Sequence, residues 1–96
     1  MNVSGVTELL QEKVMRLLKD DMDKIQQLIS VQMENLTTRK CPVYEEVLDT
    51  QIYGFSRVVD FAVRAGLVEE AEGKSLVKQL ERNLALLYEA MEKAEG

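Results

Sequence analysis

The chain has 96 residues, of which 46% are hydrophobic and 30% are charged, with one proline and five glycines. This composition is typical of one small folded helical domain and excludes a disordered chain. The formal net charge of −5 argues against direct binding to nucleic acid or to an anionic membrane surface, because both would repel an acidic protein.

The beginning of the sequence, MNVSGVTELLQEK, lacks the basic and apolar regions of a secretory signal, and no apolar run is long enough to cross a membrane. The single cysteine, Cys41, cannot form an internal disulfide, which agrees with a reducing compartment. We therefore expect a cytoplasmic protein that does not insert into membranes.

Apolar residues recur with a helical period between Leu10 and Leu36, and this period predicts one long amphipathic helix over residues 8–36. Ser4 or Thr7 is the expected N-cap, since short hydroxyl side chains satisfy the first backbone N–H groups of a helix. A helix of this length is longer than the partner helices that the rest of the chain can form.

A second helix is predicted over residues 42–65. Pro42 suits the first helical position, and Gly66 suits the left-handed residue that follows a last helical turn. Gly54 is unfavourable inside this helix, and together with Phe61 it indicates a groove filled by the first helix or by another subunit. Ordinary packing within the chain remains the alternative for this pair.

A third helix is predicted over residues 69–93, where Gly73 weakens the first turns by about 1 kcal/mol relative to alanine. The sequence thus predicts one domain over residues 1–96, with an all-α fold: an antiparallel three-helix bundle with one long N-terminal helix. Because so small a core is modest for its surface, we expect the bundle to self-associate as a homodimer.

The excess negative charge lies in residues 41–72, which contain seven acidic residues but only Arg57 and Arg64 as basic ones. An acidic segment attracts basic partners through long-range electrostatic steering. The sequence therefore favours contact with a basic protein surface.

Metal binding and catalysis both lack the usual residues, because the chain contains no histidine. Without imidazole, neither a structural zinc site nor a nucleophile with its general base can be assembled in one chain. Cys41 stands at a helix start, where the dipole favours the thiolate, while Glu45 and Glu46 oppose it. Cys41 is thus either a reactive or ligand thiol or an ordinary loop cysteine. We expect no enzymatic activity, no cofactor and no metal site within one chain, although a weak carboxylate site shared between subunits stays open.

The run CPVYEEVLDTQIYGFSRVVDFAVRAGLV, residues 41–68, resembles the signature of the YlaN family of small, leucine-rich Firmicute proteins. The segments LLKDDMDKIQQLISVQMENLT and LVKQLERNLALLYEA resemble its first and last helices. The resemblance implies an all-helical cytoplasmic protein of iron homeostasis that binds the ferric uptake repressor and relieves its repression.

Two other functions stay open, one suggested by the clustered carboxylates and Cys41 and one by the resemblance. The first is an accessory protein of iron or metal handling or of iron–sulfur assembly, and the second is an essential structural or interaction protein that affects cell shape. The family supplies no catalytic residues. The predicted contacts with a partner are five residues of the second helix, namely Glu45, Glu46, Asp49, Tyr53 and Arg57.

Overall fold

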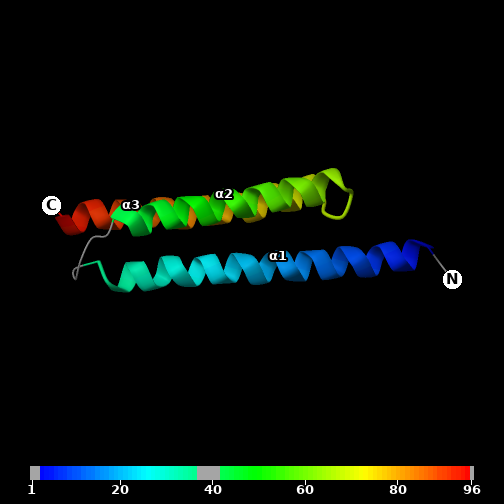
Figure 1. Ribbon diagram of the computed structural model, residues 1–96, viewed down its shortest axis with the longest axis horizontal. Coiled ribbons are helices and arrows are strands. Elements are labelled where there is room, and N and C mark those ends of the chain that lie inside the picture. Colours follow the sequence, from blue (N-terminus) through cyan, green and yellow to red (C-terminus); the bar gives the residue numbers. More distant parts are fainter. Residues whose placement is uncertain (1–2, 37–41, 96) are drawn as a thin grey trace.

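The computed structural model describes residues 3–36 and 42–95, which form three α-helices and no strands. The helices are α1 (Val3–Glu34), α2 (Pro42–Arg64) and α3 (Glu70–Glu95). They lie side by side, with α2 antiparallel to both α1 and α3 (Figure 1), and every pair of helices is in contact. The predicted all-α antiparallel bundle with a long first helix is confirmed.

The start of α1 differs from the prediction. The helix begins at Val3, so Ser4 and Thr7 lie inside it and the prediction that one of them is the N-cap is wrong. Serine and threonine favour caps, but they are tolerated in a helix interior and do not stop a helix from extending further upstream.

The first turns of α1 reach past the rest of the bundle. The Gln11 side-chain amide donates a hydrogen bond of 3.3 Å to the carbonyl of Gly66, in the turn between α2 and α3. The residues before Gln11 extend beyond that turn, as the blue end of α1 shows in Figure 1. Leu10, which the helical period assigned to the buried stripe, is therefore half exposed, and Leu9 is 67% exposed.

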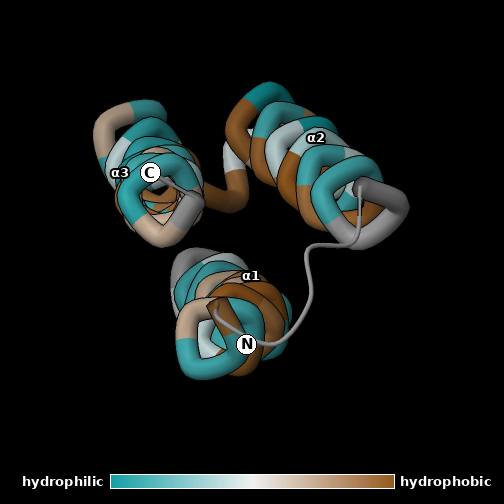
Figure 2. Tube along the Cα trace, turned by 90° about the vertical axis from the view of Figure 1, so that its left-hand side faces the viewer, coloured by the Kyte–Doolittle hydropathy of each residue, from teal (hydrophilic) through white to brown (hydrophobic). Residues whose placement is uncertain are grey.

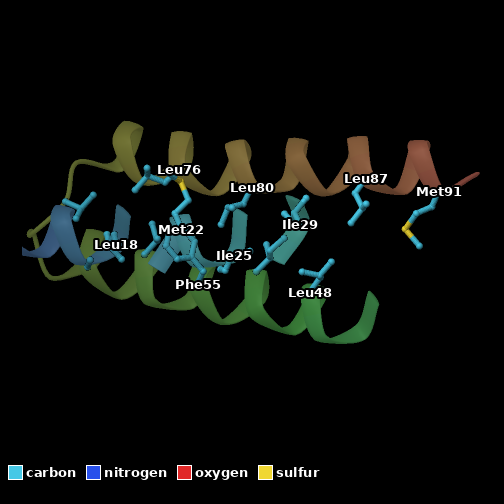
Figure 3. Close-up of a cluster of buried hydrophobic side chains, with 14 residues drawn as sticks. Leu18, Met22, Ile25, Ile29, Leu48, Phe55, Leu76, Leu80, Leu87 and Met91 are labelled. Atoms are coloured by element: carbon cyan, nitrogen blue, oxygen red, sulfur yellow. The ribbon is translucent and has the colours of Figure 1, made fainter. Parts of the chain in front are cut away.

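The hydrophobic core runs along the axis between the three helices. Hydrophilic residues lie mainly on the outer sides of the helices in Figure 2, and Figure 3 shows buried side chains converging from all three. Leu48, Leu80 and Leu87 are completely buried. No polar or charged side chain of the described residues is fully buried. The buried apolar side chains are Leu18, Met22, Ile25, Ile29, Leu48, Ile52, Phe55, Val59, Ala62, Val68, Leu76, Leu80, Leu87 and Met91.

The predicted end of α2 is confirmed. Gly66 has a φ of 77°, a left-handed conformation that glycine adopts without the steric cost of a Cβ. Its N–H donates to the carbonyl of Val63 at 3.0 Å, and the N–H of Leu67 donates to the carbonyl of Ala62 at 2.9 Å. This pair of bonds is a Schellman motif, which satisfies the last carbonyls of α2 and directs the chain into α3.

Gly73 has a packing role that the sequence did not indicate. It is buried, and a Cβ at this position would lie 2.9 Å from one methyl carbon each of Val59 and Val63 on α2. Real Cβ atoms do not approach other carbons that closely, because repulsion rises steeply within the van der Waals distance. Glycine thus allows the start of α3 to pack directly against the end of α2.

A polar contact joins α1 to α3 near the middle of the bundle. The side-chain amide of Gln26 donates a hydrogen bond of 3.0 Å to the Asn83 side-chain oxygen, and the pair is partly buried. Elsewhere the interior between the described helices is apolar. Within residues 3–36 and 42–95, no helix is both long and apolar enough to span a bilayer.

Candidate partner-binding surface on α2

The outward side of α2 carries three of the five predicted contact residues. Glu46, Tyr53 and Arg57 are separated by seven and four residues, which places them on one stripe of an α-helix. All three are exposed, and the Tyr53 side chain is 66% exposed. The structure thus brings Glu46, Tyr53 and Arg57 together on one solvent-facing stripe.

The same stripe continues with an ion pair. The Arg64 guanidinium Nε lies 3.0 Å from a carboxylate oxygen of Asp60, one helical turn away. Both side chains are largely exposed, so the pair contributes only a few tenths of a kcal/mol to stability. Since the stripe contains two acidic and two basic residues around Tyr53, it carries charges of both signs rather than negative charge alone.

The other two predicted contact residues, Glu45 and Asp49, lie on the side of α2 that faces α3. The Tyr88 hydroxyl of α3 donates a hydrogen bond of 2.8 Å to Asp49 Oδ1. Burial raises the pKa of Tyr88 to about 12, and the hydrogen bond to Asp49 and the negative charges of Asp49 and Glu45 add to this effect. Tyr88 therefore remains a neutral donor at physiological pH, and Asp49 joins α2 to α3.

Sequence reasoning did not identify Tyr88. Its only signal is a hydroxyl-bearing aromatic directly after the buried Leu87, at the edge of the apolar stripe of α3. The partner of that hydroxyl is 39 residues away in the chain, on another helix. Helical periodicity does not relate residues on different helices, so this pairing is visible only in the folded bundle.

The excess negative charge of residues 41–72 is divided among several parts of the surface. Glu45, Glu46 and Asp49 lie near the start of α2, whereas Asp60 is paired with Arg64 near its end. The remaining acids stand at the α2–α3 turn, where Glu69 and Glu72 line an open groove together with residues of α1. The acidic segment does not form one continuous acidic face.

Gly54 and Phe61, the proposed markers of a filled groove, lie on a different side of α2. Nothing lies within 4 Å of the position that a Gly54 Cβ would occupy, and Phe61 is 64% exposed. Gly54 does line an open groove with residues of α1, whereas Phe61 does not, so the prediction of a groove is correct for Gly54 alone. The prediction that α1 fills it is wrong, because the α1 backbone is held off by the core side chains between the two helices.

The predicted thiol, Cys41, lies outside the described residues. In the described part of the chain, no group of three or more histidine, cysteine, aspartate or glutamate residues is arranged to hold a metal ion. The surface features that the structure does present are an exposed aromatic ring among charges and open grooves between helices that are lined by both polar and apolar residues.

Comparison with known proteins places the chain in a family. Residues 9–93 match a family described as "Protein of unknown function (DUF1507)". The chain is 60% identical over 83 residues to a UPF0358 protein of Bacillus licheniformis, covering 86% of this chain and 89% of that protein. It is 56% identical over 90 residues to a UPF0358 protein of Shouchella clausii, covering 94% and 96% respectively. The chain therefore belongs to the DUF1507 family, whose members in these bacteria are called UPF0358 proteins.

Proposed function

We propose that this protein is a non-catalytic regulator that binds the ferric uptake repressor in the cytoplasm through the outward stripe of α2 and relieves its repression. The observation that carries the proposal is the exposure of Tyr53 between Glu46 and Arg57. The partner and the process come from the resemblance of residues 41–68 to the YlaN family.

Tyr53 has the properties of an interface anchor. Tyrosine combines a large apolar ring with a polar tip, and tyrosine and arginine are enriched among the residues that dominate binding energies. An exposed tyrosine ring gains by burial in a partner, whereas its position outside the core makes it unnecessary for folding. The ring of Tyr53 would fill a pocket of the repressor, and Arg57 would hydrogen-bond at its edge.

Electrostatics supports a partner with basic surface. The protein carries a net charge of −5, and a DNA-binding repressor presents basic groups where it holds the phosphate backbone. Attraction between the acidic protein and that basic surface accelerates encounter, and the acceleration falls as salt shortens the Debye length to about 8 Å at physiological ionic strength. Binding at or near the DNA-contacting surface would then compete with operator DNA.

The test is a binding titration with the purified repressor, followed by displacement of the repressor from labelled operator DNA. Parent protein should bind and should release the DNA. Tyr53→Ala should weaken binding by roughly 30-fold, which corresponds to about 2 kcal/mol. Glu46→Lys should lower the association rate, and its difference from parent should shrink at high salt.

The matched control is Glu92→Lys, the same charge reversal at an exposed position of α3 away from the stripe. Asp49 is unsuitable as a surface variant, because its replacement also removes the hydrogen bond from Tyr88. If the repressor does not bind the parent protein, the proposed partner is wrong. If it binds parent, Tyr53→Ala and Glu46→Lys equally well, the α2 stripe is not the contact surface.

A further inference from the structure

A long groove between α1 and α2 is open to solvent and has no occupant within the described chain. It is lined on α1 by residues from Asp21 to Leu28 and on α2 by residues from Thr50 to Val58. Because the helices are antiparallel, the Asp21 end of the α1 wall lies beside the Val58 end of the α2 wall. Gly54 leaves a hollow in this groove, since nothing lies within 4 Å of its missing Cβ.

Each wall of the groove belongs to a stripe with the 4-3-4-3 spacing of a helix that packs against a further helix. We call the two stripes together the α1/α2 face. The stripe of α1 consists of Leu17, Asp21, Lys24, Leu28 and Val31. The stripe of α2 consists of Val47, Gln51, Gly54, Val58 and Phe61.

The α1/α2 face is apolar at its ends and exposed. Leu17 is 53% exposed, Val58 is 50% exposed, and Phe61, Val31 and Val47 are exposed as well. Exposed apolar residues that continue a helical stripe are unusual on a monomeric protein and mark contact surfaces. On α2 this stripe lies next to the outward stripe that contains Tyr53, since Phe61 follows Arg57 by four residues.

We propose that the α1/α2 face is the contact between two copies of this chain, related by a two-fold axis that lies in the interface and crosses both helices. In this arrangement α1 packs antiparallel to the partner's α1, and α2 packs antiparallel to the partner's α2.

The charges of the face are self-complementary. An axis midway between Asp21 and Lys24 sets Asp21 opposite the partner's Lys24, and the symmetry repeats this pair on the other side. The same axis sets Leu17 opposite the partner's Leu28. One acid and one base at the centre, with leucines outside them, thus satisfy the self-complementarity that an isologous contact requires.

The shape of α2 is self-complementary about the same axis. The antiparallel register places the midpoint of Asp21 and Lys24 level with the midpoint of Gly54 and Val58. The two-fold therefore sets the exposed Val58 side chain over the hollow at the partner's Gly54, twice per dimer. A second copy matches both the order of Asp21 and Lys24 and the hollow at Gly54, because the two-fold brings the same residues together twice. These two matches favour a second copy over a different protein as the occupant of the face.

The decisive experiment is a charge swap, read by analytical ultracentrifugation over a range of protein concentrations. The parent should sediment with about twice the 10.9 kDa of one chain. Asp21→Lys should raise the dissociation constant by at least about tenfold, because it sets lysine against lysine at two symmetric places. Lys24→Asp should do the same. The double variant, with both charges exchanged, should restore the dimer.

Asp23→Lys is the matched control, because Asp23 is an exposed acid of α1 that does not line the groove. Gly54→Gln tests the hollow independently: it has room in the single chain, yet it should weaken the dimer by filling the space for the partner's Val58. A monomeric parent, or a double variant that stays as dissociated as the single ones, overturns the proposal. The proposal is also overturned if Gly54→Gln has the same dimer dissociation constant as the parent. None of these outcomes depends on the repressor.

Discussion

The buried glycine at the start of α3 allows a sharp test of the packing between α2 and α3. In Gly73→Ala, the gain in helix propensity is up to about 1 kcal/mol. Against it stands the new methyl group, which would lie 2.9 Å from methyl carbons of Val59 and Val63. Valine is stiff about χ1, and Val59 is buried, so these methyl groups cannot swing aside. Overpacking of this kind costs typically 1–3 kcal/mol, and we expect a net destabilisation of about 1 kcal/mol.

Gly54→Ala is the matched substitution in the same chain, because it also adds one methyl group inside a helix but meets nothing within 4 Å. It should stabilise the fold by about 0.5–1 kcal/mol. Urea denaturation followed by circular dichroism measures both changes, at several protein concentrations so that association is separated from folding. In thermal melts, each kcal/mol shifts the midpoint by about 4–8 °C for a domain of this size.

A double-mutant cycle with Val59→Ala identifies the cause. Removing the Val59 methyl groups makes room for the new Cβ, so Gly73→Ala should be less costly in that background than in the parent. If Gly73→Ala stabilises the protein as much as Gly54→Ala does, the close approach of α3 to α2 is not what requires glycine.

Two further changes probe the turn and the contact between α2 and α3. Gly66→Ala forces a Cβ into a left-handed residue and should lower the free energy of unfolding by about 1 kcal/mol in the same urea assay, whereas an unchanged midpoint would contradict the Schellman end. Tyr88→Phe removes the hydrogen bond to the exposed Asp49 and should cost about 1 kcal/mol near pH 8. Because folding raises the pKa of Tyr88 from 10.0 to about 12, this contribution is present below pH 10 and is lost between pH 10 and 12. The free energies of unfolding of the parent and Tyr88→Phe, measured by urea denaturation, should therefore converge across that range. A constant difference between them would show that the pKa of the tyrosine does not change on folding.

Local features of the sequence were enough to predict the three helices and their order. The start of α2 at Pro42 and its end before Gly66 follow from the backbone conformations that these two residues favour. The helical period follows from 3.6 residues per turn, whatever the helix packs against. These features depend on a residue and its near neighbours, and such information is complete in one sequence.

The tertiary structure decided which apolar residues are core. The sequence offers adjacent pairs such as Leu17 and Leu18 or Val58 and Val59, and in each pair the second residue is buried while the first is exposed. A helical period cannot choose within such a pair, because both residues lie within the width of one apolar stripe. The choice depends on the direction in which the neighbouring helices lie.

The candidate site shows the same division. The sequence placed Tyr53 and Arg57 correctly on the polar side of α2, since that depends on the helix alone. It grouped Asp49 with them as a free surface acid, whereas Asp49 accepts a hydrogen bond from Tyr88 of α3. It treated Gly73 as a simple weakness of a helix, whereas two valines of α2 occupy the space that a side chain would need. Contacts between helices are set by how far apart the packed side chains hold the helix axes, and that distance is a property of the whole core.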